Sequence, residues 1–328
     1  MSYTGAPASV RSLEQRIRNL EGSDGLAHRR RVAMALVVVG QMLPEGAIKG
    51  GSAMALRYGR GTRFTQDLDA ARVQPLARFR SDFEDSLSTG WAGFTGRLVE
   101  KAAPLPPAVP TDYVMQPFNV KLDYRGRPWC TVKFELGHNE VGDADEPEYH
   151  LAADLVDLFT DVGLQAPKPV PVMRADHQVA QKLHAVSGEG SERARDLVDL
   201  QLLAKGEDLD PGRVRATCVR LFEYRRQQAW PPTVVAGDGW HTLCATAVDW
   251  VRSHARIERS KAPGFHRAQQ RFPKFTLAVI LSTSPHASPW STPAGAGQGA
   301  NGKRSRRKRE TSREEQHALR KFRIPISR

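Results

Sequence analysis

Two aspartates separated by one leucine, Asp67-Leu68-Asp69, constrain the fold of this chain more than any other feature of its sequence. The surrounding segment, 67–73, has the residue pattern of a β-strand, and alternate side chains of a strand point to the same face. We therefore expect Asp67 and Asp69 to project together. Two neighbouring carboxylates repel each other and are tolerated at a buried edge mainly where a divalent cation lies between them. The pair indicates a metal site, with a solvent-facing acidic strand as the alternative.

A strand, a glycine-rich turn and a helix precede this pair. The strand is predicted at 47–49, the turn at Gly50-Gly51-Ser52 and the helix at 53–58. Backbone N–H groups at a helix N-terminus bind anions, and glycines let a phosphate approach the main chain. Alone, such a segment is more often a turn and a capped helix. Together with the two aspartates, it favours a site where metal ions clamp a nucleoside triphosphate for in-line transfer.

Hydrophobic periodicity divides the rest of the chain into a mixed half and a helical half. Further helices are expected over 10–20, from 23 or 24 to 43, 76–87, 174–186, 192–204, 212–228 and 241–257. Further strands are expected over 94–99, 113–124 and 129–136, with a hairpin turn at 125–128. A proline-rich link at 167–171 separates the halves, although a strand near 170–173 could still belong to the sheet.

The predicted domains are an N-terminal helix (1–22), an α/β domain (23–166), a mainly helical domain (167–282), and a flexible linker with a basic tail (283–328). Residues 301–328 carry 11 basic and 3 acidic side chains, which is +8 of the total net charge of +12. This tail is expected to add non-specific, salt-sensitive affinity for nucleic acid, or to be an extension without a role. Arg29-Arg30-Arg31 and the turn at 125–127 are either solvated surface or contacts for RNA phosphates.

Three cysteines, Cys130, Cys218 and Cys244, are far apart and form no CxxC pair. This pattern argues against a disulfide framework and a structural zinc site, and it fits a reducing cytoplasm. No apolar run approaches the roughly 18–20 residues that span a bilayer, so no membrane partner is expected. The N-terminus also lacks the layout of a signal peptide.

Two blocks of the sequence together resemble a known family. Lys49-Gly50-Gly51-Ser52, followed by Arg63-Phe64-Thr65-Gln66-Asp67-Leu68-Asp69, is similar to the opening motif of the polymerase-β-like nucleotidyltransferases. It resembles more narrowly the AbiEii/AbiGii toxin family of type IV toxin–antitoxin systems. Residues 170–173, leading into 181–185 and 193–200, resemble a second block of that family, and the resemblance covers about residues 10–205. The interval from Ser52 to Asp67 is longer than in the tightest motifs, and Thr65 replaces the usual serine.

The resemblance implies an α+β fold, in which a nucleotidyltransferase domain with a mixed sheet is followed by a helical domain, with the active site between them. It implies Mg²⁺-dependent transfer of a nucleotide from an NTP to an acceptor hydroxyl, with pyrophosphate release. The acceptor expected from the family is the 3′ end of tRNA, and the consequence is blocked growth. The family also implies a cognate antitoxin encoded nearby, which need not bind the toxin. The oligomeric state is not predicted.

The resemblance also implies roles for individual residues. Asp67 and Asp69 would hold the metal, in a two-ion site, while Gly51, Ser52 and Thr65 would bind the nucleotide. A third carboxylate, which helps to deprotonate the attacking hydroxyl, usually comes from a neighbouring strand in this fold. Glu135 is the first candidate for it, because the buried strand 132–136 would not otherwise carry an unpaired acid. Asp123 on the partner strand is one alternative, and an exposed Glu135 with a purely structural role is the other.

Lys182 lies at the border of the apolar stripe of its predicted helix, so its stem can pack while its ammonium group reaches a cleft. The resemblance makes it the triphosphate-binding lysine, with a surface lysine as the alternative. Asp196 and Asp199 share a packed helix face, where acids are costly unless paired. The resemblance favours Asp196 as an active-site residue that positions Lys182 or the nucleotide. A structural ion pair with Arg193 is the alternative.

Two other functions fit parts of the sequence. One is a nucleotidyltransferase that modifies a protein or a small molecule, as antibiotic-modifying enzymes do, so that labelled nucleotide would appear on that acceptor. The other is a non-catalytic protein of the same fold that binds RNA or a partner. The intact pair of aspartates and Lys182 argue against this second alternative.

An Asp67→Ala variant separates catalysis from binding. Cells that express the unchanged chain are expected to stop growing, whereas the variant should allow growth because it lacks one metal ligand. Growth after induction is followed by optical density at matched protein levels. Equal inhibition by the variant would favour a non-catalytic function.

Overall fold

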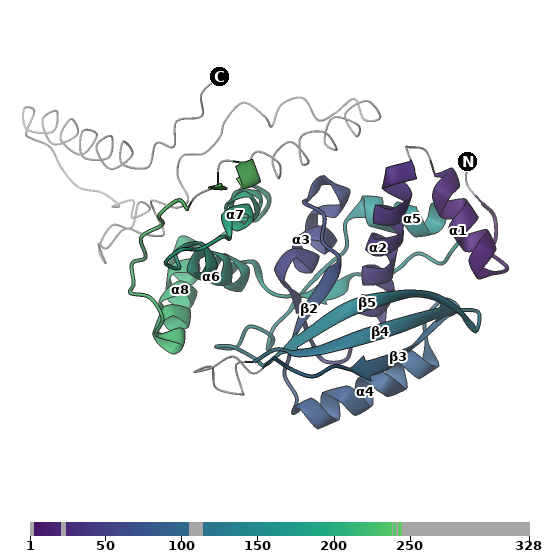
Figure 1. The fold of residues 1–328 in the computed structure, drawn as a ribbon, viewed down its shortest axis with the longest axis horizontal. Coiled ribbons are helices and arrows are strands. Elements are labelled where there is room, and N and C mark those ends of the chain that lie inside the picture. The colour runs from purple at the N-terminus through teal and green to yellow at the C-terminus, as the bar shows by residue number, and fades with distance from the viewer. Residues whose placement is uncertain (1–2, 21–23, 105–113, 238, 241, 245–328) are drawn as a thin grey trace, which may run out of the picture. The chain divides into compact units, whose positions relative to one another are not determined.

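A seven-stranded mixed sheet, ordered β3-β4-β5-β2-β1-β7-β6, positions the residues discussed above (Figure 1). The computed structural model describes residues 3–20, 24–104, 114–237, 239–240 and 242–244, all within one unit over 1–271. Most of the helix predicted at 241–257, and the whole linker and tail predicted at 283–328, lie outside the described residues.

The described strands and helices have the following bounds. The strands are β1 (Gly46–Lys49), β2 (Asp67–Arg72), β3 (Phe94–Glu100), β4 (Gln116–Tyr124), β5 (Arg127–Gly137), β6 (Glu148–His150) and β7 (Val170–Val172). The helices are α1 (Val10–Asn19), α2 (Asp24–Gln41), α3 (Gly50–Tyr58), α4 (Leu76–Thr89), α5 (Ala153–Asp161), α6 (Ala175–Val186), α7 (Ala194–Gly206) and α8 (Pro211–Arg225). A single 3₁₀ turn, η1 (Gly59–Gly61), follows α3.

The strand β2 lies at the centre of the sheet. It pairs antiparallel with β1 and parallel with β5, and β5 continues into an antiparallel meander with β4 and β3. On the other side, β1 pairs parallel with β7. The expected mixed sheet is confirmed, and the short strand near residue 170 belongs to it.

The hairpin between β4 and β5 is tighter than predicted. Tyr124 pairs with Arg127, so that only Arg125 and Gly126 form the turn. Both have positive φ angles, 50° and 71°, which is the backbone of a type I′ turn and matches the twist of the two strands. The predicted four-residue turn at 125–128 is therefore shortened to two residues.

The chain passes from β1 directly into α3. Gly50 has a φ of +65°, a conformation that glycine adopts without steric cost, and this one residue turns the strand into the helix. Gly50, Gly51 and Ser52 thus form the first turn of α3 rather than a separate turn before it. The N–H groups of this turn have no acceptor within the helix.

Aromatic residues form much of the core beneath β3–β5. Phe134 of β5 is fully buried, and its ring lies 6.4 Å from Phe79 and 5.3 Å from Phe83 on α4, measured between centroids. In Figure 1, α4 runs below β3 while α1 and α2 lie above β5. The buried residues of α1, Leu13 and Ile17, belong to the same core.

A buried arginine joins α3 to the end of the sheet. The Arg57 side chain has no exposed surface and donates to the Met173 carbonyl at 2.7 Å. It also forms ion pairs with Glu148 of β6 and with Glu207, which follows α7, the latter at 3.4 Å. Tyr58 donates to the same Glu207 carboxylate at 2.7 Å. These contacts attach α3 to the strand that leads into α6.

Two elements were not among the predicted ones. The strand β6 has only three residues, too few for a period-two pattern. The helix α5 does carry an apolar stripe at Leu155, Leu158 and Phe159, which is the helical spacing. All three cysteines are free thiols, as predicted. Among the described residues, no helix is long and apolar enough to cross a membrane.

Replacement of Phe134 by alanine is expected to lower the free energy of unfolding by about 3–5 kcal/mol, because it leaves a cavity beside the rings of Phe79, Phe83 and Phe118. Thr131 lies exposed on the same strand, and its replacement by alanine should change stability by only about 0.5 kcal/mol. Urea denaturation followed by circular dichroism measures both. A similar loss in the two variants would contradict this description of the core.

Candidate active site

Three carboxylates meet on two adjacent strands. Along β2, Leu68 is buried whereas Asp67 and Asp69 are each partly exposed, as the alternation of a strand requires. In the parallel pairing of β2 with β5, Asp69 lies opposite Glu135 and Asp67 lies opposite Lys133. Neighbouring strands are about 4.8 Å apart. The sheet therefore brings Glu135 next to the aspartate pair.

Asp123, the alternative third carboxylate, lies elsewhere. Glu135 pairs with Pro117 of β4, and Asp123 is six residues further along that strand. At about 3.3 Å per residue this separation is roughly 20 Å. Asp123 instead faces Arg97, 4.0 Å away. The structure thus joins Glu135, and not Asp123, to the aspartate pair.

The electrostatic environment of Asp69 reflects this crowding. Burial and the negative charges of Glu135 and Asp67 raise the pKa of Asp69 to about 6. The positive charges of Lys49 and Arg193 act in the opposite direction. A proton or a cation is therefore bound more readily here than at an isolated carboxylate.

The donor set fits a divalent metal ion. Within the part of the chain that the structure describes, Oδ1 of Asp67 is covered from solvent yet accepts no hydrogen bond. The cation nearest to this atom is Lys133, whose Nζ is 3.7 Å away. Three clustered carboxylates supply the hard oxygen ligands that Mg²⁺ prefers. Asp67, Asp69 and Glu135 could therefore hold such an ion.

The first turn of α3 lies directly against Asp69. A Cβ atom on Gly50 would collide with Oδ2 of Asp69, so the carboxylate occupies space that only glycine leaves open. The helix N-terminus carries a partial positive charge that stabilises a nearby anion. The glycine thus places the carboxylate and the N–H groups of α3 side by side.

Ser52 and Thr65 both contact the backbone of β2. The fully buried Ser52 hydroxyl donates to the Asp67 carbonyl at 2.8 Å and accepts from the Asp69 N–H at 3.3 Å. The Thr65 hydroxyl lies 3.4 Å from the same carbonyl. In this structure, Ser52 fixes β2 against α3, and its predicted phosphate contact would replace the hydrogen bond to Asp67.

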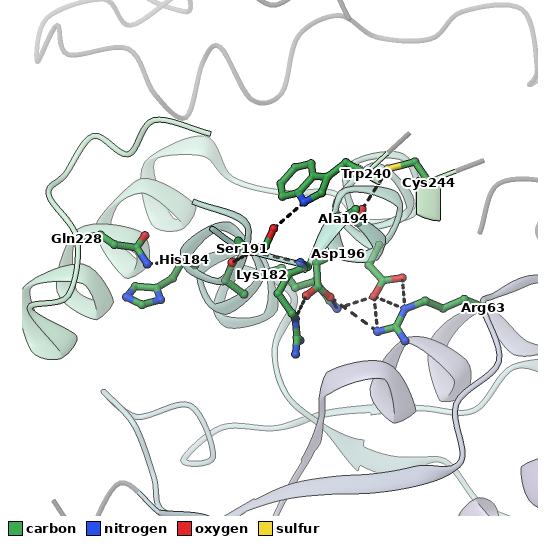
Figure 2. A network of polar contacts seen from close by, with 12 residues as sticks. Arg63, Lys182, His184, Ser191, Ala194, Asp196, Gln228, Trp240 and Cys244 are labelled. Carbon is green, nitrogen blue, oxygen red and sulfur yellow. Dashed lines mark hydrogen bonds and ion pairs between the residues drawn. The ribbon is translucent and has the colours of Figure 1, made fainter. Parts of the chain in front are cut away.

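Lys182 and Asp196 form the centre of a charged cluster (Figure 2). The ammonium group of Lys182 donates to Asp196 at 2.9 Å and to Asp199 at 2.6 Å, and all three residues are buried. Burial alone would raise the pKa of Asp196, but the charges and hydrogen bonds of Lys182 and Arg193 lower it. The predicted alternative, an ion pair between Arg193 and Asp196, is present as well, at 2.7 Å.

Sequence reasoning did not assign roles to three cations around these groups. Arg63 donates from Nε to Asp199 at 3.0 Å, and its Nη2 forms an ion pair with the same carboxylate at 3.0 Å. Lys49 is buried, and its charge acts on Asp69. Arg193 acts on Asp69 in addition to its ion pair with Asp196. Arg63 and Lys49 lie within the first motif, but only the folded chain shows what they face.

Hydrogen bonds at Ser191 fix the turn between α6 and α7. The buried Trp240 indole donates to the Ser191 carbonyl at 2.6 Å, and the Ser191 hydroxyl accepts from the Arg193 N–H at 3.2 Å (Figure 2). The Ser191 hydroxyl also donates to the Ala185 carbonyl at 2.7 Å. These bonds fix the start of α7 and therefore the position of Asp196.

A second group of ligand-type side chains lies apart from the aspartate pair. Glu148, His150 and Glu207 each place one ligand atom within 4.8 Å of the others. The guanidinium of Arg57 pairs with both carboxylates and lies 2.9 Å from Nε2 of His150. This arginine already contacts all three side chains, so the group is better described as an ion-pair network.

Comparison with known proteins gives a family match over the residues that form this site. The family model described as "Nucleotidyl transferase AbiEii toxin, Type IV TA system" matches residues 41–282. No curated protein matches the sequence.

Two solved structures are similar to the chain at low sequence identity. The nucleotidyltransferase toxin MenT4 from Mycobacterium tuberculosis H37Rv is 17% identical, with a TM-score of 0.44, over 84% of this chain and 99% of its own. The antibiotic-resistance factor ANT(2'')-Ia is 19% identical, with a TM-score of 0.33, over 62% of this chain and 95% of its own.

A Gly50→Ala variant tests the contact between α3 and Asp69. The new methyl group should displace the carboxylate and weaken Mn²⁺ binding by tenfold or more, an order-of-magnitude expectation for a lost charged ligand. Gly126→Ala is the matched control, since Gly126 has a similar φ of +71° but open space around it. Both variants should lose about 1 kcal/mol of stability from backbone strain. Unchanged Mn²⁺ titration of Gly50→Ala would contradict the arrangement.

Proposed function

The chain belongs to the AbiEii family of nucleotidyltransferase toxins of type IV toxin–antitoxin systems, and we propose that it transfers a nucleotide from an NTP to the 3′-hydroxyl of a tRNA. The observation that carries the proposal is the group of three carboxylates beside the free N-terminus of α3. Such a group suits the metal-assisted displacement of pyrophosphate from a triphosphate.

Asp67, Asp69 and Glu135 are proposed to hold Mg²⁺, in a two-ion site. When bound, Mg²⁺ neutralises phosphate charge and favours the deprotonated form of the attacking hydroxyl. Glu135 is partnered with Asp69 across the strands and is proposed as the acid that helps to accept the acceptor's proton. Its position on an exposed strand face leaves it accessible to the acceptor.

The first turn of α3 is proposed to bind the β- and γ-phosphates. Its backbone N–H groups lack helical acceptors, and Gly51 leaves room for close approach. Ser52 and Thr65 flank this turn and are proposed to contribute hydroxyl groups. Lys182 is proposed as a triphosphate-binding cation, and Asp196, 2.9 Å from it, as the residue that positions it.

The acceptor is proposed to approach along the N-terminal part of α2. The three arginines of this helix differ in their contacts. Arg30 donates to the Leu20 carbonyl at 2.6 Å, and Arg31 faces Glu14 at 3.9 Å. The guanidinium of Arg29 lies over the ring of Phe64, 4.8 Å from its centroid. Phe64 is on the loop that precedes Asp67. A cation over an aromatic ring is a common surface for nucleotides of single-stranded RNA.

Charge supports an RNA acceptor over a neutral one. The chain carries a net charge of +12, which favours a polyanionic partner. The transfer is proposed to take place in the cytoplasm. Modification of tRNA ends there would stop translation and block growth. A cognate antitoxin encoded nearby, which need not bind this chain, is proposed to relieve the block.

Transfer is tested by incubating the purified protein with total bacterial RNA, Mg²⁺ and each labelled NTP in turn. Label should enter a tRNA-sized band with the unchanged protein, and not with Asp67→Ala or with excess EDTA. The NTP that gives this band is the nucleotide donor. Label on a protein or a small molecule instead would refute tRNA as the acceptor but would still support nucleotidyl transfer. No label on any acceptor would refute the transfer.

A further inference from the structure

Arg63 faces the first turn of α3 more directly than Lys182 does. Arg63 lies on the loop between η1 and β2, and 19% of its side chain is exposed. A Cβ atom placed on Gly51 would lie 3.1 Å from Nη2 and 3.3 Å from Nη1 of this arginine. The guanidinium therefore lies directly against the helix turn that is proposed to bind phosphate.

Lys182 is more enclosed. Only 6% of its side chain is exposed, and its ammonium group is bonded to two carboxylates that are themselves almost fully buried. Two of its three N–H donors are used in this way. Arg63 contacts the same carboxylates, is more exposed than Lys182, and also lies against Gly51.

The guanidinium of Arg63 is held in place at one edge and open at the other. Its Nε and Nη2 atoms contact Asp199, and Nη2 lies 3.7 Å from Asp196. Nη1 donates no hydrogen bond to any residue that the structure describes. A planar guanidinium fixed at one edge can offer its remaining N–H groups to phosphate oxygens with little further loss of entropy.

The charge balance of the cluster also favours an anion. Arg63, Lys182 and Arg193 contribute three positive charges, and Asp196 and Asp199 contribute two negative charges. One positive charge is left over, and Arg63 is the cation of the three that touches Gly51. An arriving triphosphate would neutralise this excess.

We propose that Arg63 binds the β- or γ-phosphate of the NTP beside Gly51, with Asp199 as the positioning residue that holds its guanidinium. The inference rests on the proposed function, because it assumes that an NTP occupies the site. It adds a phosphate ligand on the loop before β2, and it assigns Asp199 a role distinct from that of Asp196.

Binding without an acceptor isolates this contact from catalysis. Each of the four NTPs, and each corresponding NMP, is titrated with Mg²⁺ into the purified full chain by calorimetry. Arg63→Gln should weaken NTP binding roughly 10- to 100-fold, the range for a lost hydrogen bond to a charged group. NMP binding should not change, because the NMP lacks the two outer phosphates. Arg63→Lys, which keeps the charge but not the fork, should lie between.

The matched control is Arg60→Gln, which removes a neighbouring arginine that pairs with Asp154 at 3.1 Å. It should leave NTP affinity within about twofold of the unchanged chain, because an exposed charge contributes little. Melting temperatures show whether each variant is folded. If Arg63→Gln does not fold, Arg63→Lys decides, since it retains the positive charge beside Asp199.

Each outcome decides. NTP binding that is equal in the unchanged chain and in Arg63→Gln would overturn the role of Arg63 while leaving the proposed function intact. Equal losses in the Arg63 and Arg60 variants, or an equal loss of NMP binding, would also overturn it, because the effect would not be specific to the outer phosphates. If the unchanged chain binds no NTP, both the inference and the proposed function fail.

Discussion

Electrostatic repulsion among Asp67, Asp69 and Glu135 is the constraint around which the rest of the structure is arranged. Three carboxylates on adjacent strands favour separation, yet the ladder between β2 and β5 holds them together. Several features reduce the cost. The N-terminus of α3 lies against Asp69, and the charges of Lys49 and Arg193 act on it. Ser52 prevents β2 from shifting, because its hydroxyl bridges the backbone on both sides of Leu68. A cation bound by the three carboxylates would remove the remaining repulsion, and this gain in free energy would favour binding of the cation.

A second charged group, on α6 and α7, follows the opposite rule. Asp196 and Asp199 are buried, and their ion pairs offset the cost of burying charge and fix the orientation of Lys182. Arg63 reaches this group from the loop before β2 and thereby ties the helices to the strand that carries the metal ligands. Removing either aspartate would leave Lys182 and Arg63 to share the one that remains. The two charged groups differ in sign: the carboxylates on β2 and β5 are left with excess negative charge, whereas the group on α6 and α7, with Arg63, carries one positive charge more than its two aspartates.

The sequence was sufficient where the decisive contacts are local. Alternation along β2 predicted that Asp67 and Asp69 share a face, and periodicity predicted most helices and strands within a few residues. It was not sufficient where distant segments meet. Glu135 and Asp123 both remain open as the third carboxylate from the sequence alone, because the register between β2 and β5, whose paired residues are 66 positions apart, is set by tertiary packing. The burial of Lys49 and the contact of Arg63 with Gly51 depend in the same way on segments that no spacing rule connects. The family resemblance, rather than periodicity, singled out Lys182 and Asp196.

The short pairing of β1 with β7 has a mechanical consequence. The Met173 N–H donates to the Ile48 carbonyl at 2.7 Å, one residue before β1 ends and two residues before α6 begins. The paired ends of β1 and β7 thus lead into α3, with its open N–H groups, and into α6, which carries Lys182. The pairing of β1 with β7 therefore sets the distance between the two helix N-termini. An insertion between residues 173 and 175 would shift Lys182 while leaving Gly50 and Gly51 in place. The hairpin at Arg125-Gly126 has no such coupling, and it is the place where an inserted tag or domain would leave this alignment undisturbed.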